Sequence, residues 1–428
     1  LDLDRAPFTA WRGRGNFIAR LLARPESAQD SSDRSVLGHV TELGYTDMAG
    51  QLHMALSQFA GVELVPFAAV AAIVGVYLLC IGPLDYFFLK KIVGRMPWTW
   101  LTFPAVVVAF SGGTYLLAHR LKGNELRLNQ VDLVDIDAES HVARGTSWST
   151  LFSPTIDTFD LAVRTEPGML APRGPRSLLC WMGVPGSGLS GLGQAAGAAM
   201  FTHAYDFSPG LDALVNLPLA QWSTRSLEAR WWGEAEAPVI AELADPGSHL
   251  LTGTLRLPES WPLIDTVLVY DRWAYELPDA AAGQTFDVDR QLEPQTVETF
   301  FRHIKNFDEK SGRAPYDRAS TDLARILETM MFHTAIGGEL YTNLVNRWQG
   351  YVDLSNQLRL GRAVLLGRAA QPAVRLLRGA GAAIEGIEVG AAGKANPSGE
   401  VLEAAGQHLT FYRFVLPVKS GAGSSSER

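Results

Sequence analysis

Cysteine is scarce in this chain of 428 residues, which contains only Cys80 and Cys180. It has no Cys-x-x-Cys pair and no paired Cys/His spacing, so no zinc-binding motif is present. Cys80 lies within an apolar run and Cys180 lies outside it, and we expect two free thiols. The sequence therefore predicts neither a disulfide framework, nor a metal site, nor a cofactor.

A basic excess is also missing. The chain has 37 Lys plus Arg against 45 Asp plus Glu, for a net charge of −8. Nucleic-acid-binding proteins normally carry a basic stripe or excess, so this balance argues against such a partner. The opening residues lack the basic and apolar segments of a signal peptide, and we expect them to continue an upstream part of the protein. The length predicts two or three domains.

Two long apolar runs dominate what is present. Residues 64–84 and 98–118 contain no charged residue, and each run has about the 20 residues that a helix needs to cross a bilayer. A helical hairpin buried in a soluble core is the alternative. Residues 65–79, however, are apolar in every direction, whereas a soluble helix normally keeps a polar face. We therefore predict a two-helix transmembrane hairpin over residues 61–122, with the lipid bilayer as a partner.

The segment between the runs predicts an orientation. Gly82 and Pro83 are expected to bend the end of the first helix. Asp85 is expected to lie at the headgroups beside a cation, although an intramembrane ion site is the functional alternative. The short connection and the start of the second run add five more residues to this membrane turn motif: Lys90, Lys91, Arg95, Trp98 and Trp100. By the positive-inside rule this connection is cytoplasmic and both flanks are extracytoplasmic, despite the cations that follow the second run.

The flanks differ in their periodicity. Residues 1–60 contain short helical patterns, which we interpret as the C-terminal remnant of an upstream α/β domain followed by a linker. Residues 123–290 alternate apolar and polar positions between Gly, Pro and Asp turns, which predicts a β-sandwich-like domain. Residues 291–418 predict a helical and mixed α/β extension, whose longest helix starts near a cap at Ser320 or Thr321. Residues 419–428 are expected to be disordered. The predicted fold class is a membrane α-helical hairpin plus an α+β body.

No stretch predicts catalysis. The glycine-rich residues 183–193 lack the ending of a phosphate loop and favour an inter-strand loop. The acidic residues 132–139 lack the glycine and bidentate glutamate of a calcium loop, and a hairpin with its carboxylates in water is expected instead. The tryptophans are numerous, and Trp231 and Trp232, with Trp222, Trp261 and Trp273, are candidates either for a ligand groove or for core packing. We name no catalytic, cofactor-binding or metal-binding residue.

The segment from Tyr77 to Gly123 resembles large bacterial envelope proteins, including those of planctomycetes. The resemblance rests on a GPLDY-like turn, residues 82–86, and a WTWL-like re-entry, residues 98–101. In such proteins a membrane hairpin follows an extracytoplasmic domain resembling a class I glutamine amidotransferase, and residues 1–22 look like the end of such a domain. The resemblance covers about the first 135 residues and implies location and architecture. It implies no activity, because residues 1–60 contain no cysteine nucleophile.

These observations predict a non-catalytic protein of the bacterial cytoplasmic membrane that scaffolds or couples a partner, such as an ATPase or a permease, at the extracytoplasmic surface. One alternative is the membrane anchor of an amidotransferase-like hydrolase whose catalytic domain lies upstream. Another is a carbohydrate- or peptidoglycan-binding module that uses Trp231 or Trp232.

Overall fold

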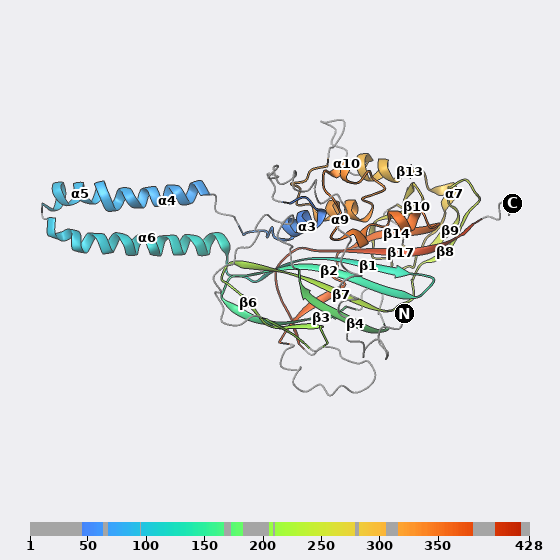
Figure 1. Ribbon diagram of the computed structural model, residues 1–428, viewed down its shortest axis with the longest axis horizontal. Helices are drawn as coiled ribbons and strands as arrows, with labels where there is room; N and C mark the ends of the chain where they lie inside the picture. Colours follow the sequence, from blue (N-terminus) through green and yellow to red (C-terminus); the bar gives the residue numbers. More distant parts are fainter. Residues whose placement is uncertain are drawn as a thin grey trace, which may run out of the picture.

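The computed structural model describes residues 45–62, 67–94, 96–166, 173–182, 205–208, 210–278, 282–304, 316–379 and 399–420. A helical hairpin projects from one end of a β-rich body (Figure 1). The glycine-rich segment 183–193, the terminal residues 421–428 and the amidotransferase-like residues 1–22 lie outside the described part, so those predictions stand as made. Lys419 and Ser420, which were expected to be disordered, instead continue the last strand of the sheet and pair with residues 244–245. The described part combines two apolar helices with a body of mixed sheet and helices, as the predicted class requires.

A 12-stranded sheet forms the frame of the body. Its main path runs through β13 (Pro294–Thr296), β11 (Trp273–Glu276), β10 (Ile264–Tyr270), β14 (Arg362–Ala369), β17 (His408–Ser420), β1 (Arg127–Asp137), β2 (Val142–Ser153), β7 (Ser223–Glu234) and β4 (Arg173–Trp181). Strands β8 (Ile240–Asp245), β9 (Thr252–Arg256) and β12 (Thr285–Asp287) branch from β17. The β17 strand runs parallel to β1 and β8, and the other pairs are antiparallel.

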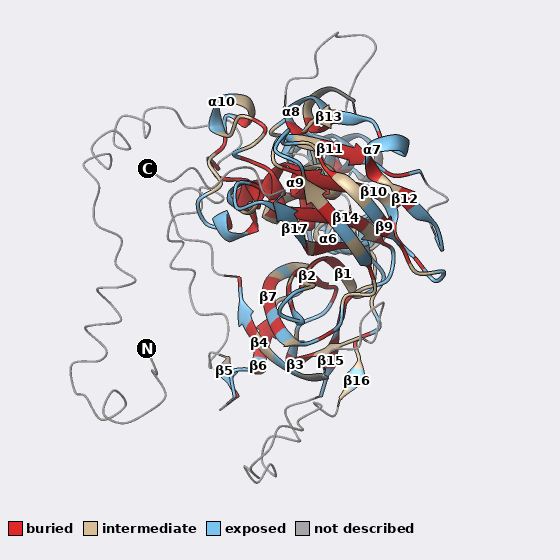
Figure 2. Ribbon diagram, turned by 90° about the vertical axis from the view of Figure 1, so that its right-hand side faces the viewer, coloured by how far each residue is buried: buried red, intermediate tan, exposed pale blue. Residues whose placement is uncertain are grey.

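A second sheet has the order β16 (Glu400–Val401), β15 (Val374–Arg378), β3 (Asp157–Thr165), β6 (Ala213–Leu219) and β5 (Asp206–Phe207). It packs on the half of the first sheet that contains β2, β7 and β4, around Leu151, Phe159, Leu214 and Leu227. Figure 2 shows this lobe closed around a buried interior. The body thus contains two packed sheets, and the second sheet includes β15 and β16, which lie beyond the predicted limit of residue 290.

Helices cover the opposite face of the first sheet, above it in Figure 1. They are α3 (Met48–Leu56), α8 (Val297–Thr299), η4 (Phe300–Ile304), α9 (Leu323–Met331), α10 (Glu339–Thr342), η5 (Gly350–Val352) and α11 (Ser355–Leu358), while α7 (Val288–Gln291) follows β12. Leu52 and Met330 from this layer share an apolar cluster with Trp148, Leu366 and Phe411 of the sheet. The layer thus belongs to the same core as the strands.

Two predicted boundaries need correction. The sheet continues from β10 and β11 into β14 and β17, so residues 291–418 share a core with residues 123–290. Helix α3 is not a remnant of another domain, since Met48 and Leu52 are fully buried in the body. Asp47 ties it there, because its carboxylate accepts from the α3 backbone at Ala49 (2.8 Å) and from Arg347 N (2.9 Å). A short amphipathic pattern alone cannot show which core it enters.

The predicted long helix after residue 320 is also shorter than expected. Helix α9 begins after Asp322, whose side chain accepts from Ala324 N, and it ends at Met331. Gly337 and Gly338 then take positive φ values of 103° and 57° before the short α10. Glycine adopts this left-handed backbone without steric cost, so the pair separates the two helices. The cap is thus Asp322 and not Ser320 or Thr321.

The acidic segment of β1 is only partly in water, contrary to expectation. Asp132 is 1% exposed and accepts from Gln130 Nε2 (2.9 Å) and Ala373 N (2.6 Å). Farther along, Asp137 and Glu139 pair with the arginine of β14, Arg362. Alternation along β1 places Asp132 on a covered face, because the second sheet and the 373–374 backbone close over it.

Asp132 predicts a pH dependence of stability. Burial raises the pKa of its carboxyl, against the opposing effect of its hydrogen bonds. The Asp132 carboxyl of the folded state therefore keeps a proton that the unfolded chain releases near pH 4. The contribution of this group to the free energy of unfolding is fully present at low pH and is lost as the pH rises through the folded pKa. We expect the difference in unfolding free energy between the wild type and Asp132→Asn, from chemical denaturation, to fall as the pH rises above about 4. A difference that is constant across this range would contradict the assignment.

Candidate functional site: an apolar hairpin and its junction with the body

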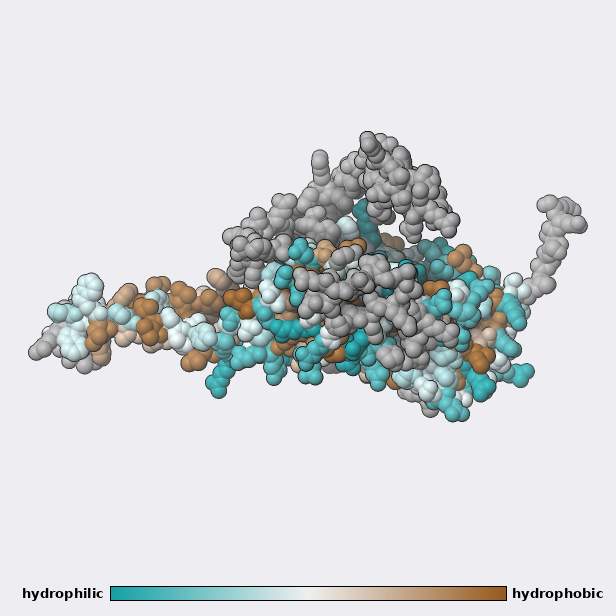
Figure 3. All heavy atoms as spheres, turned by 90° about the horizontal axis from the view of Figure 1, so that it is seen from below, coloured by the Kyte–Doolittle hydropathy of each residue, from teal (hydrophilic) through white to brown (hydrophobic). Residues whose placement is uncertain are grey.

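Two helical spans, residues Phe67–Lys91 and Thr99–Lys122, are long and apolar enough to cross a membrane. They contain 25 and 24 residues, and in the most apolar stretch of each span no residue is buried. At about 1.5 Å per residue, each span exceeds the roughly 30 Å of a hydrocarbon core. Figure 3 shows apolar residues along the projecting hairpin and hydrophilic residues gathered on the body. This distribution separates the hairpin from an ordinary core helix, which would be covered by protein.

The first helix extends past Gly82 and Pro83, where the sequence predicted its end. Helix α4 (Phe67–Leu79) continues through the π-helical η1 (Cys80–Leu84), α5 (Asp85–Phe88) and the π-helical η2 (Leu89–Val93). Pro83 lies inside this helix without ending it, because the wider turn of a π-helix accommodates an interrupted hydrogen-bond ladder. The chain reverses at Gly94, whose φ is 66° and whose N–H donates to Leu89 O (2.8 Å).

The charged and aromatic residues of the predicted turn motif therefore lie at the far end of the hairpin. Lys90 donates to the Tyr86 hydroxyl (3.1 Å) and lies 5.3 Å from the centre of that ring. Asp85 forms no ion pair with any residue described in the structure, so the expected pairing is not seen there. Trp98 and Trp100, at the start of the second span, are 48% and 89% exposed. Arg95 lies outside the described residues.

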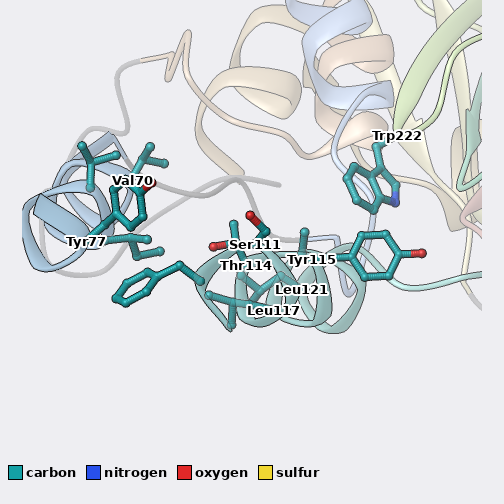
Figure 4. A pocket seen from close by; sticks show the side chains of 12 residues that line it. Val70, Tyr77, Ser111, Thr114, Tyr115, Leu117, Leu121 and Trp222 are labelled. Carbon is teal, nitrogen blue, oxygen red and sulfur yellow. The ribbon is translucent and has the colours of Figure 1, made fainter. Parts of the chain in front are cut away.

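A groove runs between α4 and α6 (Thr99–Lys122) on the side toward the body (Figure 4). Its volume is about 590 Å³. Val70 and Tyr77 line it from α4, Ser111, Thr114 and Tyr115 line it from α6, and Trp222 of the body closes its end. The rings of Tyr77 and Phe110 meet edge to face across it, with centres 5.3 Å apart. The two helices therefore enclose an open, mostly apolar groove between them.

The body end of the groove is an aromatic and basic cluster, which we call the junction cluster and which consists of Tyr115, His119, Lys122 and Trp222. The His119 ring lies 4.4 Å from Tyr115 and 5.4 Å from Trp222, between ring centres, and Lys122 Nζ lies 5.7 Å from the Trp222 ring. The His119 Nδ1 is 2.9 Å from the Asn124 side-chain oxygen. The His119 Nε2 and the Trp222 Nε1 are enclosed and have no partner in the part that is described.

A tight turn positions Trp222 between β6 and β7. Its φ is 56°, and its backbone N–H donates to Ser153 O (2.8 Å). A non-glycine residue in this region of the backbone is uncommon and costs energy, so the surrounding contacts must hold it there. This backbone conformation directs the large Trp222 side chain against His119 of α6.

Polar contacts hold the segment that precedes the hairpin against the body. Asn129 of β1 donates to Leu56 O (3.0 Å) and Gln58 O (2.7 Å), and Arg127 donates to Ala60 O. The rings of Phe59 and Phe152 lie 5.6 Å apart. Residues 56–60 are therefore bound to β1 and β2.

The tryptophan pair of β7 divides between the two faces of the sheet. Trp231 is 4% exposed, and its ring fills the space where a side chain at Gly145 would stand. Trp232 is 40% exposed on the other face, in register with Arg144 of β2 and Arg176 of β4. Strand alternation makes this separation unavoidable. Trp231 therefore belongs to the core, as Trp261 does, and only Trp232 of the pair is accessible to a ligand.

Neither predicted free thiol forms a disulfide. Cys180 on β4 is exposed, and its Sγ donates to Glu228 O (3.4 Å). Burial of part of the side chain, together with the nearby Glu228 carboxylate, raises the pKa of this thiol. It is therefore a weak nucleophile. No group of three or more His, Cys, Asp or Glu in the described ranges could hold a metal ion.

No protein-family model matches the chain, and no curated protein matches it in sequence. Among solved structures, the yeast delta-COP-I mu-homology domain complexed with the Dsl1 WxWxV peptide is matched with a TM-score of 0.25 at 8% identity. The yeast delta-COP-I mu-homology domain by itself is matched with a TM-score of 0.24 at 9% identity. Both matches cover 69% of this chain and 98% of the other chain. A likeness this low supports no statement about function.

Proposed function

We propose that this chain is a non-catalytic, membrane-anchored protein, held in a bacterial cytoplasmic membrane by the hairpin α4–α6. The observation that carries the proposal is the uncovered apolar surface of the most apolar stretch of each helix. Soluble proteins rarely expose apolar patches larger than a few hundred Å², and larger ones indicate a membrane or a partner surface. The two lysines at the hairpin tip favour a cytoplasmic tip and an extracytoplasmic body.

The body serves in this proposal as a rigid platform for a partner at the membrane surface. Contacts of the sheet with residues 56–60, and of Trp222 with α6, support this role, because they hold the segment before the hairpin and one of its helices against the body. Two helices are too few to form a solute path, so a transport role requires a permease or an ATPase as partner.

We expect such a partner subunit to copurify stoichiometrically with this chain in mild detergent. Recovery of the chain alone would contradict the coupling role.

Alkaline extraction tests the anchoring directly. Full-length chain expressed in bacteria should stay in the membrane pellet at high pH, as an integral membrane protein does, and should float with lipid vesicles after reconstitution. Release into the supernatant by alkali would show peripheral attachment and would contradict the proposal.

Trp232 favours a second candidate function, the binding of carbohydrate or peptidoglycan. An exposed aromatic ring beside two arginines offers a flat apolar face with polar donors at its rim. Trp232→Ala should then abolish retention on peptidoglycan while the near-ultraviolet circular dichroism spectrum stays that of a folded protein. Unchanged retention would remove this candidate. The hydrolase-anchor alternative depends on a domain upstream of residue 1 and remains a prediction.

A further inference from the structure

We infer that the groove between α4 and α6 holds an acyl chain of one anionic phospholipid, whose phosphate lies beside Lys122. The inference rests on the proposed membrane location and adds to it a specific lipid as ligand. It starts from the space that the two helices leave between them.

Membrane helices normally associate through small residues that let their backbones approach closely. The hairpin has such residues, but they are not used between its own helices. A Cβ built at Gly75, Gly112 or Gly113 would meet no atom within 4 Å. The space between the helices is instead the groove of about 590 Å³, within the roughly 300–1,000 Å³ range of small-molecule sites. In a bilayer this space must be filled by an apolar group.

The shape of the groove favours a lipid chain over a third helix. Val70 and Tyr77 line one wall and Thr114 and Leu121 the other, and Trp222 closes the end at the body. A transmembrane helix of a partner would have to continue past this end, whereas an acyl chain ends there, at the level of its headgroup. Figure 4 shows the Trp222 side chain beside Tyr115, across the end of α6.

The charge at that end selects the headgroup. Lys122 lies against the Trp222 ring, whereas Arg120, two residues earlier, is exposed about 200° around the helix from it. The nearest acidic residue in the sequence, Glu125, pairs with Arg127 at 3.7 Å and so does not neutralise Lys122. His119 Nε2, enclosed in the junction cluster, also has no partner among the described residues. Basic pockets between membrane helices are a recurring form of anionic-lipid site.

The headgroup must supply the preference, because a lipid tail is as apolar as the side chains it replaces. A basic residue near a membrane surface contributes about 1 kcal/mol toward an anionic lipid, which is roughly fivefold in affinity. Lys122 thus predicts a preference of about fivefold for phosphatidylglycerol over phosphatidylcholine with the same chains. Removal of this cation should abolish the preference.

Native mass spectrometry of the full chain, supplied with these two lipids in equal amounts, tests the inference. We expect one retained lipid, mostly phosphatidylglycerol, and loss of the preference in Lys122→Gln. Arg120→Gln, on the far side of the same helix end, and Lys90→Gln, at the other end of the hairpin, are the matched controls and should change nothing. Ala118→Phe should fill the groove and expel the lipid, whereas Val108→Phe, at an exposed site outside it, should not.

Equal retention of both lipids, or an Ala118→Phe variant that still holds its lipid, would overturn the inference. Flotation with phosphatidylcholine vesicles, measured in parallel, separates this failure from failure of the proposed function. A chain that floats but shows no lipid preference remains membrane-anchored without a lipid site. A chain that does not float lacks the anchoring on which both proposals depend.

Discussion

The double variant Leu79→Arg/Val108→Arg is expected to lose stable membrane insertion. Leu79 and Val108 lie near the middle of their spans and are 54% and 70% exposed. An arginine at the centre of a transmembrane helix costs about 3 kcal/mol on insertion scales, so two cost about 6 kcal/mol. This lowers the inserted fraction by about four orders of magnitude. The measurement is the pelleted fraction after alkaline extraction.

The matched control places the same two changes at the ends of the same helices. Phe67→Arg and Trp100→Arg replace side chains that are 86% and 89% exposed, and arginine near a helix end extends to the headgroups at little cost. This variant should remain in the membrane pellet. If the central and terminal variants behave alike, the hairpin does not cross hydrocarbon.

The second large effect is expected at Arg413, which is 1% exposed in the centre of the first sheet. Its Nε lies 2.5 Å from Asp135 Oδ1, and its Nη1 donates to Val352 O (2.6 Å) in the helical layer. Arg413→Met leaves the largely buried Asp135 without this partner, and breaking a buried pair from one side costs about 3–5 kcal/mol. Chemical denaturation followed by tryptophan fluorescence should report that loss.

Asp135 supplies its own control, because a second arginine contacts it from the surface. Arg144 Nε lies 3.2 Å from Asp135 Oδ2, and its side chain is 65% exposed. Arg144→Gln should cost less than about 1 kcal/mol, as exposed pairs do. Asp135→Asn/Arg413→Met should recover part of the loss, since the uncompensated charge is gone. A single Arg413→Met variant as stable as Arg144→Gln would contradict this account.

Local alternation was enough to predict most strands. Residues 361–369 and 408–418 were expected to be strands and correspond to β14 and β17, and the alternating segments of residues 141–277 correspond to β2, β3, β4, β7, β9, β10 and β11. The pairing was not predictable in the same way. The parallel contact of β17 with β1 joins residues about 280 positions apart in sequence, and no local pattern carries that information. The predicted boundary at residue 290 failed for this reason.

The burial of some polar side chains could not be predicted from the sequence either. Asp132 and Arg413 read as polar positions on strands, yet each is 1% exposed. Their burial follows from what packs over them, namely the 373–374 backbone for Asp132 and the η5 segment for Arg413. Neither covering element is close in sequence, so only the tertiary structure reveals the partners that make such burial tolerable.

The candidate site could be predicted only in part. Two spans follow directly from runs without charge, and the structure contains both helices. The groove does not follow, because it depends on the separation of α4 from α6 and on Trp222 of a distant turn. Trp222 was one of five tryptophans considered together for a ligand groove, and no sequence signal distinguished it. Its positive φ, which places it against the helix, is visible only in the fold.

The central claim, that the hairpin crosses a membrane, is tested most directly by the accessibility of single cysteines on either side. Lys91 and Glu125 are both exposed and lie at opposite ends of the hairpin. In a Cys80→Ser/Cys180→Ser background, Glu125→Cys should react with an impermeant maleimide in intact spheroplasts, and Lys91→Cys should react only after permeabilisation. The reverse pattern would uphold the crossing and invert the orientation. Equal reaction of both cysteines in intact spheroplasts would contradict the crossing itself.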